Sequence, residues 1–386
     1  MNCLELFAGC GGLGYGFHKQ GFHIEVCNEL EKTIADTYKE NFKETNVIVG
    51  DITKVEIKKA IYDSFKEKQC DVILGGPPCV AYSMSGQRNS RDPRGQLFKD
   101  YVEMVKHLKP KSFVMENVKG ILTMKHDKPI LNKEEQIIAD EYYQLEEKKM
   151  LILAEKKKTS EKKEIETQLK EVNSQLKKFD TSMFRTNVTN IIKNTFIELG
   201  YKVEMKLLNS ANYGVPQKRE RVIFIGLRND ISKDICYPIE THNKEGTNGK
   251  QKWVSVKEAI EDLKHLSFQD KKSKSIQHIE TKHSDSFKEK IKQTKQGTSV
   301  NPKYSEAFYR CKEDEPSNTV KENHGGVFVH YEQDRVMTPR ELARLQSFPD
   351  DFIFKGTKSK ILVQLGNAVP CGLSNAIAKE IKSMIN

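Results

Sequence analysis

Apolar segments of strand length alternate with amphipathic helical patterns between Asn2 and Arg228, and this alternation restricts the fold more than any other feature of the chain. The expected strands are residues 3–7, 24–28, 47–49, 72–75, 113–116, 202–208 and 222–227. The expected helices are residues 13–19, 32–41 and 98–108. Strands that alternate with helices form βαβ units, in which successive strands run parallel. We therefore predict an α/β protein with a Rossmann-like, doubly wound and mainly parallel sheet.

An insertion at about residues 125–181 interrupts this pattern and is dense in lysine and glutamate. Asn132 and Glu135 have the spacing of a capping box, which predicts that a helix begins after Asn132. Apolar residues then recur alternately four and three apart, as in a coiled coil, at Ile165, Leu169, Val172, Leu176 and Phe179. With Thr159-Ser160 as the turn, these signals predict an inserted helical hairpin. Because its charges balance, we expect a solvated decoration or a self-association arm rather than a substrate-contacting element.

The pattern becomes irregular after Arg228 and regular again near Arg335. We expect a large domain at residues 1–228, a small irregular domain at residues 229–329, and a C-terminal segment at residues 330–386 that completes the large domain. Most of the histidines lie beyond Arg228. Their spacing is not that of metal ligands, so we expect surface or loop residues. These histidines include His278, His283, His324 and His330.

Composition narrows the classes of protein further. The formal net charge of +10 favours a polyanionic partner such as nucleic acid, although lysine-rich surfaces also serve solubility. No apolar run is expected to cross a bilayer, and the N-terminus lacks the regions of a signal peptide. The eight cysteines are scattered without a CxxC pair, so neither a disulfide framework nor a zinc site is indicated. We expect a soluble, cytoplasmic protein with reduced thiols and no bound metal.

A glycine-rich turn, Phe7-Ala8-Gly9-Cys10-Gly11-Gly12, directly follows the first expected strand. Such a turn lets a ligand approach backbone atoms closely. The second strand ends at Asn28-Glu29, and Asp51-Ile52 follows the third, which places carboxylates where ribose hydroxyls and an adenine amino group could be bound. The turn lacks the Gly-Lys-Ser/Thr of a P-loop. We therefore expect a nucleotide-like cofactor at this end of the sheet.

A glycine-proline turn follows the fourth strand and holds a single cysteine, in the sequence Gly75-Gly76-Pro77-Pro78-Cys79. Proline fixes φ and glycine permits unusual backbone angles, so the turn can aim one thiol into a cleft at the carboxyl edge of the sheet. Cys79 is therefore the candidate nucleophile. A small, inert core residue is the alternative interpretation of this cysteine.

In order along the chain, these segments resemble the cytosine-5 DNA methyltransferases of the bacterial restriction-modification type. The matching motifs are Phe7-Ala8-Gly9-Cys10-Gly11-Gly12, Gly76-Pro77-Pro78-Cys79, Glu116-Asn117-Val118, Gln217-Lys218-Arg219-Glu220-Arg221, Thr338-Pro339-Arg340-Glu341, Arg344-Leu345-Gln346-Ser347-Phe348-Pro349 and Gly366-Asn367-Ala368-Val369-Pro370. Val80 and Tyr82 depart from the family's usual Gln-x-Phe-Ser continuation after the cysteine.

The resemblance implies an S-adenosylmethionine-dependent methyltransferase domain, with residues 229–329 as a target-recognition domain and the final helix beside the glycine-rich turn. It implies that Cys79 attacks cytosine C6, that Glu116 holds cytosine N3 and the amino group, and that Arg219 and Arg221 support the developing charge. The cofactor residues that it implies are Phe7, Gly9, Cys10, Gly11, Gly12, Glu29, Asp51, Ile52, Gly76, Pro78, Leu97, Asn367 and Ala368.

Double-stranded DNA is the partner that the resemblance implies, and a base inside a duplex must be flipped out before C5 can be reached. The polar residues 83–95 suit a loop that closes over DNA, with Ser85 probing the vacated space. Arginines of this loop would contact phosphates, namely Arg88, Arg91 and Arg94. An ordinary exposed loop is the alternative. We expect a monomer without membrane contact, paired with a cognate restriction endonuclease that acts on the same site.

Three other functions fit parts of the sequence. A transfer-RNA cytosine-5 methyltransferase shares many motifs, but the chain has no Cys-Phe-Thr element like that of the RNA-directed branch. A noncatalytic DNA-binding relative would not need intact Cys79, Glu116 and Arg219. A nicotinamide oxidoreductase would account for the glycine-rich turn but not for the Pro-Pro-Cys and Gln-x-Arg-x-Arg segments. Methyl transfer to cytosine C5 of DNA is therefore the predicted activity.

Overall fold

The computed structural model describes residues 1–77, 97–128, 130–156, 162–303, 307–322 and 328–386. The described residues fall into two compact units. The first unit is built from residues 1–77, 97–119 and 196–386, and the second from residues 120–195.

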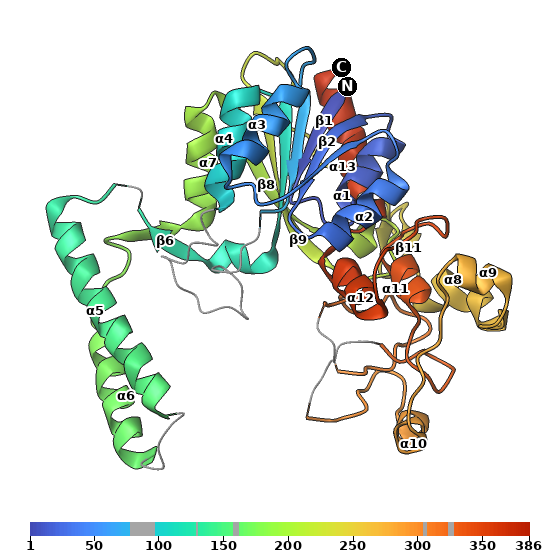
Figure 1. The fold of residues 1–386 in the computed structure, drawn as a ribbon. Helices are drawn as coiled ribbons and strands as arrows, with labels where there is room; N and C mark the ends of the chain where they lie inside the picture. The colour runs from blue at the N-terminus through green and yellow to red at the C-terminus, as the bar shows by residue number, and fades with distance from the viewer. Residues whose placement is uncertain (78–96, 129, 157–161, 304–306, 323–327) are drawn as a thin grey trace. The chain divides into compact units, whose positions relative to one another are not determined.

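A seven-stranded sheet lies at the centre of the first unit, in the order β3-β2-β1-β4-β5-β9-β8 (Figure 1). Its strands are β1 (Asn2–Leu6), β2 (His23–Glu29), β3 (Asn46–Val49), β4 (Val72–Gly75), β5 (Ser112–Val118), β8 (Tyr201–Asn209) and β9 (Glu220–Arg228). Strands β1 to β5 are parallel, whereas β9 runs antiparallel to both of its neighbours. All seven expected segments are strands of this sheet, with ends that move by at most two residues. The predicted, mainly parallel α/β fold is confirmed.

Helices cover both faces of this sheet (Figure 1). One face carries α1 (Gly12–Lys19) and α2 (Lys32–Asn41), and the other carries α3 (Val55–Ser64) and α4 (Leu97–Leu108). Tyr101 shows how α4 closes its face. The side chain is fully buried, and its hydroxyl donates to the carbonyl oxygens of Ile73 and Val114 at 3.1 Å each. A buried phenol is thereby satisfied by strands β4 and β5, as a buried hydroxyl must be.

The C-terminal helices complete the core of the first unit. They are α11 (Pro339–Leu345), α12 (Lys358–Asn367) and α13 (Cys371–Ile385). Helix α13 packs along α1, as expected; a Cβ on Gly16 would lie only 2.2 Å from the backbone nitrogen of Asn375. One stretch, Lys358–Ile385, which contains α12 and α13, is long and apolar enough to cross a membrane by length and composition alone. Because 67% of its apolar window is buried inside the protein, this stretch behaves as a core element.

The described residues between 229 and 338 form short elements joined by irregular chain. In the described part these are β10 (His242–Asn243), β11 (Gln251–Lys252), α8 (Val256–Ile260), η5 (Glu261–His265), α9 (Lys271–Ser275) and α10 (Asp285–Gln293). Val256, Ile260 and Leu263 belong to the same hydrophobic cluster as Leu342 and Leu345 of α11. Burial against the C-terminal helices therefore anchors this segment, which has little regular structure of its own.

Two histidines of this segment lie in loops, as the expectation of surface or loop residues allowed, but neither is a surface residue. His278 and His330 are fully buried, and Nδ1 of His278 lies 2.9 Å from the hydroxyl of Thr338. Nδ1 of His330 accepts hydrogen bonds from the backbone N–H groups of Glu332 and Gln333. His324 lies outside the described residues. The spacing of these histidines argued against metal ligation but did not reveal that two of the rings fill interior space.

The second unit contains the predicted helical hairpin. Its elements are η3 (Lys119–Thr123), whose first residue belongs to the first unit, β6 (Lys125–Asp127), α5 (Lys133–Lys156), α6 (Lys162–Leu176), β7 (Arg185–Asn187) and most of α7 (Val188–Glu198). Asn132 caps α5 as predicted, because its Oδ1 accepts from the backbone N–H of Glu135 and its own N–H donates to the Glu135 carboxylate.

Helices α5 and α6 pack through a small cluster of their own, made of Tyr142, Leu145, Ile152, Ile165, Leu169, Val172 and Leu176. Phe179 lies beyond the end of α6, where its ring contacts that of Tyr142 with centroids 5.7 Å apart. Thr159-Ser160, the expected turn, lies outside the described residues.

Candidate functional site

The glycine-rich turn leaves β1 through residues with positive φ, at Phe7 (53°), Gly9 (56°) and Gly11 (94°). A Cβ on Gly11 would lie 2.6 Å from the ring of Phe42, and one on Gly12 would lie 2.4 Å from the carbonyl oxygen of Val369. In contrast, a Cβ on Gly9 would meet no atom within 4 Å. The turn is thus packed tightly against α2 and the C-terminal segment, while its Gly9 side is open to a ligand.

The acidic residues of the predicted cofactor site lie at the same edge of the sheet as this turn. The Glu29 carboxylate accepts from the backbone N–H of Gly9 at 2.8 Å and from that of Glu31 at 3.0 Å. Burial raises the pKa of Glu29 above its ordinary value. Asp51 follows β3 and accepts from the backbone N–H of Thr53 at 3.0 Å, which lowers the pKa of Asp51. Ile52 beside it is buried.

The C-terminal residues of the predicted cofactor site also reach the turn. A Cβ on Gly12 would lie 3.3 Å from the side chain of Ala368, and the Cys10 thiol lies 3.8 Å from the carbonyl oxygen of Gln364. Burial raises the pKa of Cys10 to about 12, so this thiol is neutral at physiological pH and is no nucleophile. The amide of Asn367 instead donates to Glu322 at 2.7 Å. Leu97, half-buried, begins α4.

The predicted catalytic carboxylate is held at the end of β5 by β9. Arg221 Nε lies 2.6 Å from Glu116 Oε1, and both side chains are 13–14% exposed. A Cβ on Gly76 would lie 2.9 Å from the other Glu116 oxygen, so the carboxylate lies beside the start of the proline-cysteine segment. The amide of Asn117 donates to the carbonyl oxygen of Pro77. The Glu116–Arg221 pair is partly exposed, oriented and adjacent to the predicted nucleophile segment.

Arg219 has a different environment from Arg221. Its side chain is 1% exposed, and its two terminal nitrogens donate to the carbonyl oxygens of Val320 and Gly366 at 2.8 Å each. Burial lowers the pKa of Arg219 well below its ordinary value, and the neighbouring Arg221 charge lowers it further. Arg219 therefore joins the end of the irregular segment to α12, whereas Arg221 is the arginine in contact with Glu116.

Six predicted site residues lie outside the described residues and remain sequence predictions. They are Pro78, Cys79, Ser85, Arg88, Arg91 and Arg94.

Gln217 belongs to the Gln-x-Arg-x-Arg motif, but the motif alone predicts no role for its side chain. Gln217 is fully buried; its amide donates to the carbonyl oxygen of Leu345, and its Oε1 accepts from the backbone N–H of Val320. It thus reinforces the junction that Arg219 makes. The Gln-x-Arg-x-Arg spacing was the available signal, since alternate residues point to one side of an extended segment.

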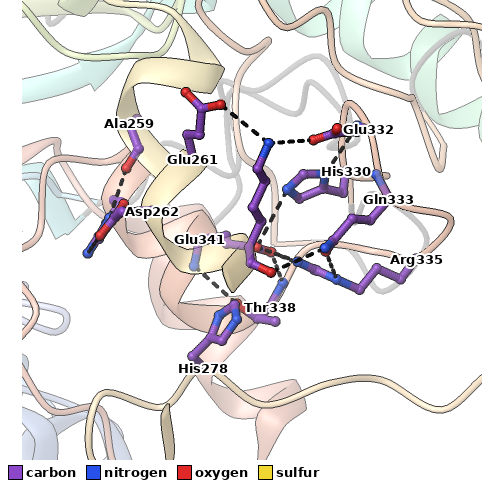
Figure 2. Close-up of polar contacts among 12 residues, drawn as sticks. Ala259, Glu261, Asp262, His278, His330, Glu332, Gln333, Arg335, Thr338 and Glu341 are labelled. Carbon is purple, nitrogen blue, oxygen red and sulfur yellow. Dashed lines mark hydrogen bonds and ion pairs between the residues drawn. The ribbon is translucent and has the colours of Figure 1, made fainter. Parts of the chain in front are cut away.

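A buried charge network holds the segment before α11 (Figure 2). Glu341 accepts from both terminal nitrogens of Arg335, at 2.8 and 2.6 Å, and from the backbone N–H of Thr338 at 2.7 Å. Burial alone would raise the pKa of Glu341, but the bonds from Arg335 keep it below its ordinary value. Burial lowers the pKa of His330, which faces this carboxylate, to about 4. The network fixes the start of α11 and contributes no group to the cofactor turn.

Comparison with known proteins identifies the family. The family model described as C-5 cytosine-specific DNA methylase matches residues 1–148 and 171–383. The chain is a C-5 cytosine-specific DNA methylase. Among curated relatives of the methylase, the Type II methyltransferase M1.HphI of Haemophilus parahaemolyticus is 33% identical over 100% of this chain and 87% of its own length. The Type II methyltransferase M.DdeI of Desulfomicrobium norvegicum is 30% identical over 99% of this chain and 88% of its own.

Solved structures share the fold of the methylase. A putative DNA modification methyltransferase encoded within an E. coli prophage superposes with a TM-score of 0.68 at 22% identity, covering 100% of this chain and 99% of that one. DNMT2 of Spodoptera frugiperda gives a TM-score of 0.55 at 16% identity, covering 99% of each chain. The predicted S-adenosylmethionine-dependent methyltransferase fold is confirmed.

The methylase uses S-adenosylmethionine as its cofactor, and the turn fits this group. The open side of Gly9 admits a ligand to the backbone, and Glu29 is already hydrogen-bonded to Gly9 at the edge where a ribose would lie. Among the described residues, no group of three or more His, Cys, Asp or Glu side chains could hold a metal ion.

Proposed function

We propose that this methylase flips one cytosine out of a specific duplex DNA sequence and methylates its C5 through a covalent adduct with Cys79, as the protective half of a Type II restriction-modification pair. One observation carries the proposal. The Glu116–Arg221 pair stands at the carboxyl end of β5, beside Gly76, on the sheet edge that also carries the cofactor turn. In this proposal the pair holds the flipped base between Cys79 and the methyl donor.

In this mechanism, the Cys79 thiolate adds to C6 of cytosine, and the electron pair of the C5–C6 double bond becomes available at C5. Glu116 holds N3 and the exocyclic amino group, and Arg221 orients Glu116 and supports the carbonyl oxygen of the base. S-adenosylmethionine, when bound, would supply the electrophilic methyl group, which bonds to C5 as its bond to sulfur breaks and a neutral thioether is left. A base or a water molecule then removes the C5 proton, the double bond forms again, and the Cys79 thiolate is expelled.

Arg219 acts in this proposal as a clamp on two backbone carbonyl groups rather than on the base. The cofactor pocket is built from the turn at residues 7–12, Glu29, Asp51-Ile52, Gly76, Pro78, Leu97 and Asn367-Ala368. Residues 229–329 read the DNA sequence, residues 1–228 and 330–386 form the catalytic domain, and Ser85, Arg88, Arg91 and Arg94 close over the duplex. The protein acts in the cytoplasm as a monomer, and its cognate endonuclease cleaves the same site when it is unmethylated.

The test incubates the purified protein with labelled S-adenosylmethionine and either mixed-sequence duplex DNA or transfer RNA, followed by bisulfite sequencing. Cys79→Ala is the inactive variant, and Cys236→Ala is its matched control, because Cys236 is an exposed free cysteine in the first unit. Methylation of C5 within one short recurring DNA motif, lost only in Cys79→Ala, is the expected result. Transfer to RNA alone would replace the DNA assignment, and no transfer by folded protein would favour a noncatalytic DNA-binding role.

A further inference from the structure

A buried carboxylate lies beneath the cofactor turn and has no role in the proposed reaction. Glu5 is in β1 and 1% exposed. Its Oε1 accepts from the backbone N–H of Gly14 at 2.9 Å, and its Oε2 accepts from the hydroxyl of Tyr38 at 2.6 Å. Burying a carboxylate is costly unless hydrogen bonds compensate it. These two donors therefore determine whether Glu5 is ionised or protonated in the interior.

Through these donors Glu5 contacts both sides of the turn. Gly14 lies in the first turn of α1, and a Cβ there would lie 2.1 Å from Glu5 Oε2, which leaves room for glycine alone. Tyr38, fully buried in α2, stacks on Phe42 with ring centroids 4.3 Å apart. A Cβ on Gly11 would in turn lie 2.6 Å from the Phe42 ring. A continuous set of contacts therefore runs from Glu5 to both Gly11 and Gly14.

We propose that Glu5 is a positioning residue for S-adenosylmethionine, holding the turn between Gly11 and Gly14 in its ligand-accepting conformation through Gly14 and Tyr38. This inference rests on the proposed function, because it concerns the cofactor turn of that reaction. The ionised carboxylate accepts from both donors at once. A protonated carboxyl carries a hydrogen on one of the two oxygens, so one of the two bonds is lost or reversed.

The charged and titratable surroundings of Glu5 offer no competing partner among the described residues. Burial raises the pKa of Glu5 to about 7, the Tyr38 and Gly14 bonds lower it, and the nearby Glu29 raises it. The other facing groups are the thiols of Cys3, Cys10, Cys27 and Cys371, each with a pKa raised chiefly by burial. The two hydrogen-bond donors are therefore the groups that favour the ionised form of Glu5 in the described part of the chain.

The experiment measures S-adenosylmethionine affinity by calorimetry for the full-length wild type, Glu5→Gln and Tyr38→Phe. Tyr62→Phe is the matched control, because it removes a tyrosine–glutamate hydrogen bond, to Glu103, that lies away from the turn. At pH 8 we expect Kd to rise about tenfold in Glu5→Gln and Tyr38→Phe, the equivalent of one hydrogen bond to a charged group. Tyr62→Phe should bind as the wild type does, and the KM for DNA should be unchanged in all three variants.

A pH series gives a second readout. Wild-type affinity should strengthen as the pH rises through about 7, as Glu5 ionises, and this dependence should be absent in Glu5→Gln. Wild-type affinity in folded Glu5→Gln and Tyr38→Phe, or an equal loss in Tyr62→Phe, would overturn the positioning role. If Glu5→Gln does not fold, the S-adenosylmethionine affinity of Tyr38→Phe tests the positioning role in its place. Failure of the wild type to bind S-adenosylmethionine would instead overturn the proposed function, and the inference with it.

Discussion

Replacing Arg219 by methionine separates a clamping role from a base-contacting one. Methionine is unbranched like arginine but apolar, so it suits a site that is 1% exposed. The change removes both hydrogen bonds to the carbonyl oxygens of Val320 and Gly366. Sequence resemblance assigned Arg219 to the charge that develops on the base. Its two hydrogen bonds support the proposal that it instead stabilises the junction between the irregular segment and α12.

The expected cost follows from these contacts. A hydrogen bond from a charged donor contributes about 1.5–3 kcal/mol, so the loss of both costs roughly 3–6 kcal/mol. Removing a buried guanidinium also removes its desolvation penalty and its repulsion from Arg221, which offsets on the order of 1–2 kcal/mol. The free energy of unfolding should therefore fall by about 2–4 kcal/mol.

Urea unfolding followed by circular dichroism measures this loss, and single-turnover methyl transfer at saturating S-adenosylmethionine measures the chemistry. Arg221→Met is the matched control: it breaks the pair with Glu116 and should reduce methyl transfer far more than stability. For Arg219→Met we expect the reverse, with lost stability and residual transfer in the folded fraction. Wild-type stability of Arg219→Met together with abolished transfer would refute the clamp.

Three further perturbations test other parts of the structure. Gly16→Ala should destabilise the protein by about 2–3 kcal/mol in thermal denaturation, because its Cβ would lie 2.2 Å from the Asn375 backbone nitrogen; an unchanged Tm would show that α13 does not pack on α1 in this way. Burial lowers the pKa of His330 from 6.5 to about 4, so the unfolded chain takes up a proton that the folded state does not. The free energy of unfolding should fall by about 3 kcal/mol as the pH drops from 6.5 to 4, a slope that His330→Gln should flatten if the assignment is right. Replacing residues 149–170, which the family match leaves out, by a short Gly-Ser turn should change the kcat/KM of methyl transfer less than about threefold; a loss of DNA binding in gel-shift assays would give the hairpin a substrate role.

Local patterns were sufficient to predict the sheet and the hairpin. Strands such as Val72–Gly75 are short, apolar on both faces and bounded by turn residues, so their identity does not depend on distant contacts. The Asn132–Glu135 cap involves residues three apart, and its reciprocal bonds formed as predicted. The alternation of strands and helices then fixed the parallel topology, because βαβ connections permit few others.

The features that the sequence did not reveal depend on packing between residues that are far apart along the chain. Arg219 and Arg221 are two residues apart and chemically identical, yet one is buried against the carbonyl groups of Val320 and Gly366 while the other holds Glu116. Nothing local distinguishes them, since their partners lie about a hundred residues away along the chain. The burial of the loop residue His330 was not predicted for the same reason: its ring is enclosed by the network around Glu341, which forms only in the folded protein (Figure 2).

Covalent trapping tests the central claim most directly. The methylase would be incubated with S-adenosylmethionine and a duplex carrying its mapped site, in which 5-fluorocytosine replaces the target base so that the C5 substituent cannot be eliminated. Intact-mass and peptide analysis should find a stable one-to-one adduct on Cys79 that is absent from Cys79→Ser. A folded wild type that binds this duplex and S-adenosylmethionine but forms no adduct, or forms one on another residue, would contradict the account.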